Sequence, residues 1–453
     1  MLVAVFVVAW QLLAPPVVGL ANNGDFHKVI GAFNLVGPNE DDYKFAPTTY
    51  TFNPGPHLVF TFSSVEQLLA LAAIGANTIF SKIGTFDIRF IGLVHGALYL
   101  LSLFLILPLL RALSTTRRLI CSALLILIFG DVLYVAALNS FYMDTAAIVF
   151  SLLSVVFVCR LLKWGRRGDV TGFVVSAICL AASKAQHAPL GVLIALMFAL
   201  KPSIFLPGLR TSLRFGIVAS LLGAVLWTLS ATPWDYRATP LFSQVFFGIL
   251  PRSDDPGRSL RQLGLDDSYK PYIGLYAYSN GVPLNDPLFA HKFLDKVSYA
   301  RLGLYFLRHP ALTYSLIRTA MGEAGQQRPY MGNFDRSTGV APSTGSRAFA
   351  RWSDLKTALF LNRGDFYIFY TLALALALPL FLFVRRNEFP SGAAYAGLTL
   401  SLMTMAEIAI SALGDALDFV RHFSVFTALN DVVLAALLIC ILHLRSSRQV
   451  HLA

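Results

Sequence analysis

Charged side chains are scarce in this chain, and their scarcity excludes a compact soluble fold. Asp, Glu, Lys and Arg make up 13% of the 453 residues, whereas 56% are hydrophobic. Soluble domains carry about 25% charged residues. The mean hydropathy of +0.63 agrees with this imbalance. We therefore expect a polytopic membrane protein.

Cysteine is equally sparse and lacks the spacing of a metal or disulfide site. Cys121, Cys159, Cys179 and Cys440 all lie in apolar stretches, without a CxxC pair or a Cys/His cluster. This pattern excludes a disulfide scaffold and a zinc site. We expect the four thiols to be packing residues. The sequence also lacks an internal repeat and a clear GxxxG pair that would specify a dimer.

Long apolar runs are what the chain does contain. About 20 apolar residues cross a bilayer as a helix. Ten runs qualify or nearly qualify: 1–20, 90–110, 119–138, 145–162, 170–183, 188–200, 215–231, 366–384, 393–413 and 423–444. The first lacks a basic n-region, which favours an uncleaved anchor over a signal peptide.

One further run, Val65 to Phe80, requires a decision because counting it as a span would invert every later loop. Arg117, Arg118, Arg166 and Arg167 would then face outward, against the positive-inside rule. We therefore interpret the run as an interfacial or re-entrant helix beneath the first outer loop.

Basic residues concentrate on one side of this topology. With both termini in the cytoplasm, fourteen cations face inward with only Asp169 and Glu388 beside them: Arg111, Arg117, Arg118, Arg160, Lys163, Arg166, Arg167, Lys201, Arg210, Arg214, Arg385, Arg386, Arg445 and Arg448. The positive-inside rule thus accounts for the net charge of +11. The remaining charges nearly cancel, so we do not expect a nucleic-acid partner.

Three regions follow from this topology. Residues 1–231 form an N-terminal transmembrane module with a first outer loop at 21–89, residues 232–365 form an extracytoplasmic loop domain, and residues 366–453 form a C-terminal module of three helices.

The loop domain has local patterns of its own. Ser253 or Asp254 can start a short helix, and Arg301 to Ala320 has helical spacing broken at His309-Pro310, which predicts two amphipathic helices on the outer leaflet. Gly322 to Arg347 is rich in Gly and Ser without periodicity, which is typical of a mobile loop.

The short outer connections hold more ionisable residues than a turn needs. They are Asn22–Asp25, Asn139–Asp144, Ser183–His187 and Gly414–His422. All four lie at one depth on the outer face, so we expect a polar pocket at the membrane surface.

Simpler interpretations exist for the single residues. Lys184 and His187 can anchor at the head-group level, and Asp418 with Arg421 can form an ordinary ion pair. Acids within spans are costly to bury, and we expect Asp131, Glu407 and Asp431 to join helices. Glu40-Asp41-Asp42 is typical of a solvated acidic turn.

The layout as a whole resembles the GT-C superfamily of membrane glycosyltransferases, over nearly the whole chain, and most resembles bacterial hexose transferases of cell-surface glycan assembly. The order and combination of segments carry this resemblance. They are Asn22–Phe26, Ser140–Asp144, Lys184–Pro189, Phe246–Leu250 with Ser253–Pro256 and Leu263–Leu265, then Asp418, Arg421-His422 and Asn430-Asp431.

This resemblance implies an all-α, GT-C-like protein whose donor is a sugar on a polyprenyl phosphate, used at the outer face of the plasma membrane. It maps the family's catalytic first-loop acid onto Asp25. An acceptor hydroxyl needs such a carboxylate as general base, and the leaving phosphate needs fixed cations. We expect Arg421 and Lys184 there, with His187 and His422. Supporting or acceptor-side residues would be His27, Asp144, Gln186 and Asp418.

A single displacement opposite the phosphate would invert the anomeric centre. The chain lacks a clear DxD or ExD pair near Asp25. We therefore predict no metal ligands, no certain cofactor, and leave a divalent-cation requirement open. The expected partners are the lipid-linked donor, a glycan acceptor and membrane lipids.

Two other functions remain open from the sequence. A polysaccharide polymerase or ligase would also use lipid-linked glycans, with essential loop arginines such as Arg328 or Arg336. A transporter or flippase would place its polar site near the bilayer midplane, often in related halves, but no repeat is found here and most ionisable residues gather on one face.

Overall fold

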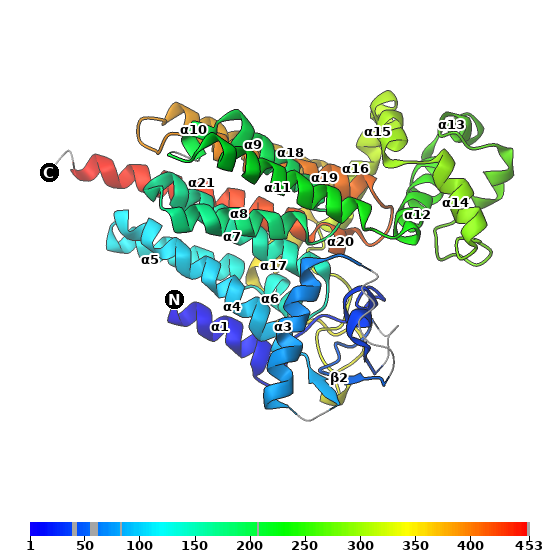
Figure 1. The fold of residues 1–453 in the computed structure, drawn as a ribbon, viewed down its shortest axis with the longest axis horizontal. Coiled ribbons are helices and arrows are strands. Elements are labelled where there is room, and N and C mark those ends of the chain that lie inside the picture. Colours follow the sequence, from blue (N-terminus) through cyan, green and yellow to red (C-terminus); the bar gives the residue numbers. More distant parts are fainter. Residues whose placement is uncertain (39–42, 55–61, 82–83, 206–207, 451–453) are drawn as a thin grey trace.

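A bundle of long apolar helices forms the body of the protein (Figure 1). The computed structural model describes residues 1–38, 43–54, 62–81, 84–205 and 208–450. Six helical segments in this part of the chain are long and apolar enough to cross a membrane. They are α4 continued by η2 (Arg89–Ile106 and Leu107–Ala112), α7 (Met143–Trp164), α11 (Thr211–Ser230), α18 (Gly364–Val384), α19 (Ala393–Leu413) and the apolar part of α21 (Ser424–Val450).

The predicted count of about ten spans is not confirmed, because the other apolar runs form shorter or bent helices. These are α1 (Leu2–Leu13), α5 (Thr115–Phe129), α6 (Val132–Leu138), α8 (Arg167–Ala181), α9 (Ala188–Leu200) and α10 (Pro202–Phe205). Helices α5 and α6 are bent by 59° and count as a seventh span if taken together. The bend follows Gly130, where the side chain of Asp131 accepts a hydrogen bond from Leu133 N and caps α6.

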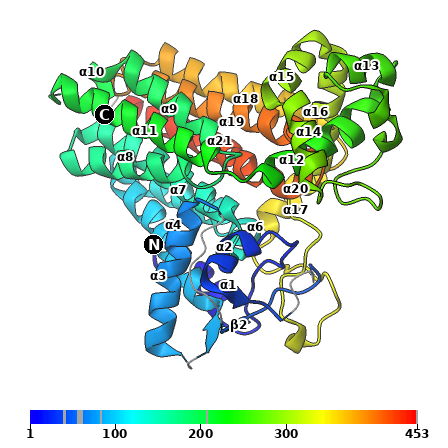
Figure 2. The ribbon, with the colours of Figure 1, turned by 45° about the vertical axis from the view of Figure 1, so that its right-hand side comes forward.

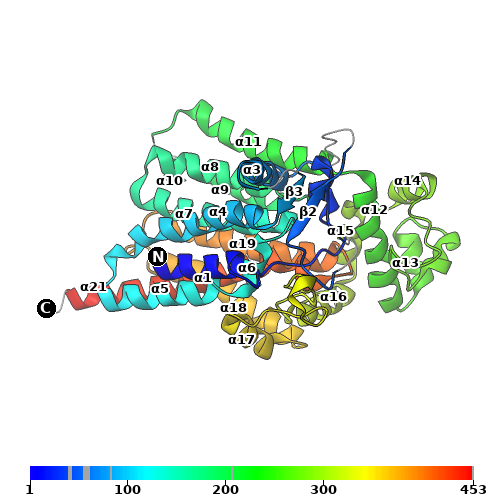
Figure 3. The same cartoon turned by 90° about the horizontal axis from the view of Figure 1, so that it is seen from below.

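Helix α3 (Val65–Phe80) runs across the direction of the bundle helices and lies near one end of them (Figures 1 and 3). The hydroxyl of Ser64 caps it by accepting from Glu66 N. Glu66 and His95 of α4 form a fully buried pair 3.0 Å apart. This orientation supports the interpretation of α3 as an interfacial helix, and its depth in a membrane stays a prediction.

The first outer loop contains a small antiparallel sheet, so the prediction of an all-α fold is wrong at this point. Its strands β1 (Leu35–Val36), β2 (Thr49–Phe52) and β3 (Thr85–Asp87) follow α2 (His27–Ile30) and η1 (Gly31–Phe33). The strands are only two to four residues long, and such short runs leave little alternation in the sequence. Phe26, Tyr50 and Phe86 pack beneath the sheet with Phe141.

Residues Trp234–Arg308 form a separate lobe with its own aromatic core, named here the outer domain (Figure 2). Its elements are α12 (Trp234–Ser243), η3 (Gln244–Ile249), η4 (Leu250–Arg252), α13 (Pro256–Gln262), η5 (Asp267–Tyr272), α14 (Pro287–Lys296) and α15 (Tyr299–Arg308). Helix α13 is capped by Asp255, which accepts from Arg258 N, and not by Ser253 or Asp254 as predicted. The proline at its first position fixes this start.

The predicted break at His309-Pro310 is confirmed. Helix α15 ends at Arg308, and α16 (Pro310–Ala324) begins with the proline. Helix α16 then packs against α18, α19 and α20 (Phe419–His422). Helix α15 contributes to the core of the outer domain, whereas α16 joins that core through Leu316 and a second cluster through Ala320 and Met321.

The segment predicted to be a mobile loop, Gly322 to Arg347, is instead pinned to the first outer loop. It has little regular structure beyond the end of α16 and η6 (Arg336–Thr338). Its backbone nevertheless pairs with residues 19–46: Gly19 N donates to Asn333 O at 2.9 Å and Ala21 N donates to Gly332 O at 3.0 Å. Helix α17 (Arg351–Phe360) follows. The hydrogen bonds come from backbone groups, which the composition of the segment does not reveal.

Candidate active site

Asp25 is held in a tight turn between α1 and α2. The side chain of Asn22 accepts hydrogen bonds from Gly24 N at 2.9 Å and from Phe26 N at 3.1 Å. Gly24 has φ +98°, a conformation that L side chains rarely adopt. Phe26 is buried and packs edge-on against Tyr142 with ring centroids 4.7 Å apart. The turn therefore fixes the position of the Asp25 carboxylate.

Arg421 of α20 binds this carboxylate. Its Nη1 lies 2.7 Å from Asp25 Oδ2, and its Nε donates to Asp418 Oδ2 at 2.7 Å. Asp418 has a left-handed backbone, with φ +50°, that starts the short helix. The guanidinium also lies over the ring of Tyr142, 5.1 Å from the ring centroid. Arg421 is thus a buried, oriented cation with only 8% of its side chain exposed.

A third carboxylate, Asp144 at the start of α7, extends the network. Its Oδ2 lies 3.6 Å from Arg421 Nη1, and Lys184 Nζ donates to its two oxygens at 2.9 and 3.0 Å. His187 Nε2 lies 3.0 Å from Asp144 Oδ1, and the opposite ring nitrogen lies 3.0 Å from Glu407 Oε1 of α19. A chain of paired charges therefore runs from the first outer loop into the bundle.

His422 occupies the other side of Arg421. Its Nδ1 lies 3.0 Å from Gln186 Oε1, and Gln186 Nε2 donates to the carbonyl of His422 at 3.1 Å and to Ser411 Oγ at 3.2 Å. His422 Nε2 lies 3.8 Å from Asp415 Oδ2. Gln186 therefore positions the imidazole between the end of α8 and the end of α19.

The outer domain covers part of this charge cluster. Lys28 pairs with Asp25 at 2.5 Å and lies under the ring of Tyr236, 4.1 Å from the ring centroid. The Tyr236 hydroxyl is 2.8 Å from His27 Nε2. The site is thus bounded by three parts of the chain: the first outer loop, the ends of the bundle helices and the outer domain.

Burial and neighbouring charges have opposite effects on the pKa of Asp25. Burial favours a neutral Asp25, but Arg421, Lys28 and Lys184 outweigh it and hold the pKa of Asp25 well below its usual range. Burial lowers the pKa of Lys28 to about 8. Asp25 is therefore ionised at neutral pH.

The pKa values of Asp415 and His422 are both shifted toward the neutral form of the side chain. Burial raises the pKa of Asp415 to about 7. Burial, followed by Arg421 and Lys184, holds the pKa of His422 well below its usual range. His422 is therefore neutral at neutral pH, whereas Asp415 titrates there.

Burial also lowers the pKa of His187, but Glu407 and Asp144 raise it to about 9 overall. Both ring nitrogens face carboxylates, so the imidazolium form can donate to both. The side chain of His187 is fully buried between Asp144 and Glu407. Its contacts orient Asp144, which in turn holds Lys184.

The structure brings the predicted residues together. Arg421 contacts both Asp25 and Asp144, and Asp144 holds Lys184. His187 and Asp418 contact this network directly, and His422 and Gln186 hydrogen-bond to each other beside it. His27 lies at its edge, where Tyr236 contacts it. The chemical role of each residue stays a prediction.

Sequence reasoning missed four contributors. Lys28 lies three residues after Asp25, a spacing at which the first turn of α2 brings the two side chains together. Glu407 and Asp415 were visible as acids in or beside a span, but their partners are distant in sequence. No signal marks Tyr236, because only the tertiary position of the outer domain brings it to Lys28.

No group of three or more His, Cys, Asp or Glu side chains within the described ranges is arranged to hold a metal ion. The acids at the site already pair with cations from the chain itself. The acidic residues Glu40, Asp41 and Asp42 lie within 39–42, outside the described residues. A divalent-cation requirement therefore gains no support from the arrangement at Asp25.

Comparison with known proteins gives one family. The model of the YfdI N-terminal transmembrane domain matches residues 1–451. Comparison with curated proteins gives no match.

Among solved structures, the archaeal oligosaccharyltransferase AglB from Archaeoglobus fulgidus, in complex with an inhibitory peptide and a dolichol-phosphate, is similar at 12% sequence identity. The match covers 97% of this chain and has a TM-score of 0.36. The chain spans about half of AglB, 49% of its length. With a TM-score this low, nothing about the site follows from the likeness.

Proposed function

The chain belongs to the family of the YfdI N-terminal transmembrane domain, a glycosyltransferase-like family of multi-pass membrane proteins, and from this membership we propose a specific reaction. The protein is an inverting GT-C glycosyltransferase. It transfers a sugar, a hexose in our proposal, from a polyprenyl-phosphate donor to a cell-surface glycan or a lipid-linked acceptor. The reaction takes place at the outer face of the plasma membrane.

One observation carries the proposal: a partly buried carboxylate, a partly buried lysine and a buried arginine share a network at one end of a membrane bundle. Asp25 Oδ2 lies 2.7 Å from Arg421, and Lys184 is linked to the same guanidinium through Asp144. A base for the acceptor hydroxyl and cations for a departing phosphate are the two elements that this transfer needs.

The proposed reaction needs only the two substrates and residues of this chain. The acceptor oxygen bonds to the anomeric carbon as the bond from that carbon to the phosphate oxygen breaks. The hydroxyl proton moves to Asp25, and the lipid phosphate leaves as an anion beside Arg421 and Lys184. Arg421 is the stronger phosphate ligand of the two, because its planar fork can bind two oxygens at once. One displacement inverts the anomeric configuration.

The ion pairs of Asp25 imply an order of binding. While Arg421 and Lys28 both contact Asp25, its pKa is far below that of an effective general base at neutral pH. A donor phosphate that takes over part of the Arg421 fork weakens one of these contacts, which raises the basicity of Asp25. The donor therefore binds before the acceptor is activated.

The test is Asp25→Asn in reconstituted protein supplied with a polyprenyl-phosphate hexose and a glycan acceptor. We expect transfer to fall at least about 100-fold, the lower range for loss of a general base. Donor binding should be retained or strengthened, because Arg421 loses a competing carboxylate.

Asp87→Asn is the matched control, since Asp87 lies in the same outer loop but pairs with its neighbour Arg89. It should transfer at close to the wild-type rate. Wild-type turnover by Asp25→Asn would refute the role of Asp25. Absence of any glycosidic product from the wild type with a range of lipid-linked donors would refute the function itself.

The competing interpretation as a polymerase or ligase depends on loop arginines. Arg328 donates to the carbonyl of Ser346 at 2.7 Å and pairs with Asp354, and Arg336 lies over the ring of Phe45. Both arginines thus make contacts within the protein, and no ion pair links either of them to Asp25 in the described part of the chain. A transferase should tolerate Arg336→Gln, whereas a polymerase or ligase that relies on this arginine should not.

A further inference from the structure

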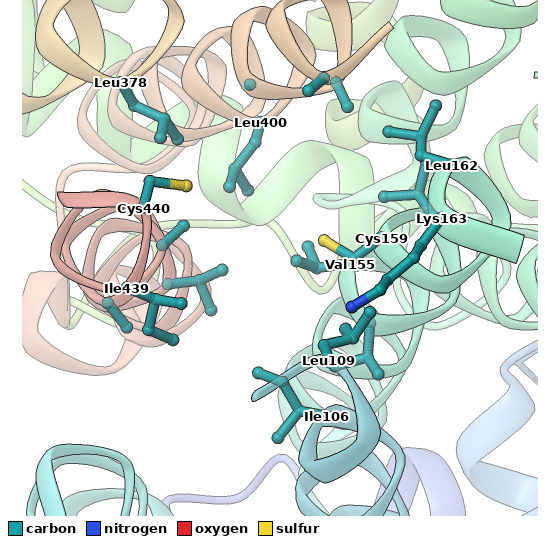
Figure 4. Close-up of a pocket in the computed structure, with 18 of the residues that line it drawn as sticks. Ile106, Leu109, Val155, Cys159, Leu162, Lys163, Leu378, Leu400, Ile439 and Cys440 are labelled. Atoms are coloured by element: carbon teal, nitrogen blue, oxygen red, sulfur yellow. The ribbon is translucent and has the colours of Figure 1, made fainter. Parts of the chain in front are cut away.

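A second feature lies inside the bundle, away from the charged site. It is an apolar cavity of about 360 Å³ between helices α4, α5, α7, α18, α19 and α21 (Figure 4). Its wall includes Ile106, Val155, Leu378, Leu400 and Ile439. The volume is more than twice the roughly 150 Å³ that holds a benzene molecule in an engineered protein cavity.

The cavity is separate from the proposed active site. Asp144 begins α7 at the site, whereas Cys159 and Lys163, near the other end of α7, line the cavity. At 1.5 Å per residue, Lys163 is about 28 Å from Asp144 along the helix. His443, at the C-terminal end of the apolar part of α21, also lines the cavity. The cavity therefore opens toward the bundle end where the basic residues gather.

A basic side chain marks this end of the cavity. Lys163 reaches into the opening with its ammonium group (Figure 4). The other charges here are paired within the chain: Arg160 with Asp169 at 2.7 Å, and Glu388, a carboxylate that also lines the cavity, with Arg385 at 3.1 Å. No carboxylate in the described part of the chain forms an ion pair with Lys163. An anionic group at the opening would find an unmatched cation there.

We propose that this cavity binds one acyl chain of an anionic phospholipid, with the head-group phosphate against Lys163. Water does not fill such a cavity favourably, because the wall offers few polar partners. A hydrocarbon chain restores the packing contacts that an empty space lacks. Basic pockets between membrane helices on the cytoplasmic side recognise anionic head groups.

The charge distribution favours a phospholipid over the polyprenyl tail of the sugar donor. The donor phosphate belongs beside Arg421 in the proposed reaction, at the opposite end of α7 from Lys163. A polyprenyl tail would bring hydrocarbon to the cavity but no negative charge to its opening. The preference for a phospholipid over the donor tail rests on the proposed glycosyl transfer, whereas lipid binding itself rests only on the cavity and its rim.

The chain carries its own probes for the test. Cys159 and Cys440 both line the cavity and lie on opposite walls (Figure 4). Both are free thiols. In a variant with Cys121→Ser and Cys179→Ser, a maleimide should label only the cavity pair. Phosphatidylglycerol should slow this labelling at least tenfold more than phosphatidylcholine does.

Native mass spectrometry of the detergent-purified protein gives the second measurement. We expect the wild type to retain one phosphatidylglycerol in preference to phosphatidylcholine, and Lys163→Gln to lose this preference. Lys201→Gln is the matched control, since Lys201 lies at the same end of the bundle but outside the cavity wall. It should behave as the wild type.

Val155→Phe should exclude the lipid by filling the cavity. If that variant does not fold, the thiol labelling and the comparison of lipid retention by the wild type and Lys163→Gln still test the proposal. Equal protection by the two phospholipids, or retention of a polyprenyl lipid in their place, would overturn the proposal.

Discussion

Asp415 is the side chain at the site whose charge depends most directly on pH in the physiological range. Burial raises its pKa to about 7. An unfolded aspartate titrates near 3.9, so between these two values the folded protein holds a proton that the unfolded chain has lost. Linkage then requires the free energy of unfolding to fall as pH rises from about 4 to about 7.

We predict that Asp415→Asn removes this pH dependence. Relative to wild type, the variant should gain stability as pH rises through the window, by an amount on the order of 4 kcal/mol at most. Thermal unfolding in detergent at a series of pH values measures the difference. Asp254→Asn, at an exposed position in the outer domain, is the control. Parallel pH curves for wild type and Asp415→Asn would contradict a buried, proton-holding carboxyl.

At the residue scale, the sequence was most informative where several polar residues crowd a short connection between spans. That excess singled out Asp25, Asp144, Lys184 and Arg421, and the structure joins them in one network. The sequence does not show which of these residues form ion pairs, because the partners come from different connections. Glu407 shows the limit: it was interpreted as a helix-joining acid, and its partner is His187 in the neighbouring loop.

At the scale of elements, a buried ion pair fixes α17 against the bundle. Lys356 of α17 donates to Asp431 of α21 at 2.8 Å, and both side chains are almost wholly buried. Tyr134 donates to the same carboxylate at 2.6 Å and Trp352 at 2.7 Å. Asp431 therefore joins α6, α17 and α21, a wider role than the two-helix contact expected from its place in a span.

We predict that Lys356→Met destabilises the protein by about 3–5 kcal/mol, because it leaves a buried carboxylate without its cation. Adding Asp431→Asn should recover most of the loss, since the amide oxygen still accepts from Tyr134 and Trp352. Detergent-based unfolding of both variants measures this. Lys292→Met, at an exposed lysine of the outer domain, should stay within about 0.5 kcal/mol of wild type. A double variant as unstable as the single one would show that the charge is not the cause.

Helix boundaries could be predicted where a residue in the helix itself sets them, and not where a contact with a distant segment does. His309-Pro310 marked the break between α15 and α16 because proline cannot continue the preceding helix. The run 119–138 was expected to be one span, yet it bends at Gly130-Asp131, where the carboxylate caps a new helix and also accepts from Ser353 N. That second contact comes from 222 residues away.

At the scale of the whole molecule, the two outer segments and the bundle make a single site. The first outer loop supplies Asp25, the ends of the bundle helices supply Asp144 and Arg421, and the outer domain supplies Tyr236. The carbonyl oxygens of Gly332 and Asn333, in the segment that follows α16, accept backbone hydrogen bonds from Ala21 and Gly19 and so hold that segment to the start of the first outer loop. Composition predicted a membrane protein and charge placement predicted its orientation, but neither encodes this docking, which depends on backbone groups.

The last prediction concerns the orientation of the molecule in the membrane. The proposed donor and acceptor require the charged site to face outward, and the positive-inside rule places the basic bundle end in the cytoplasm. Two exposed positions report on this: Asn280 in the outer domain, and Gly168 in α8 at the basic end, where an added side chain meets open space. In an active background with all four native cysteines replaced, a membrane-impermeant maleimide should label Asn280→Cys in intact cells. It should label Gly168→Cys only after permeabilisation. The reverse pattern would place the charged site in the cytoplasm, where transfer to a cell-surface glycan could not occur, and the proposed function would fail with the topology.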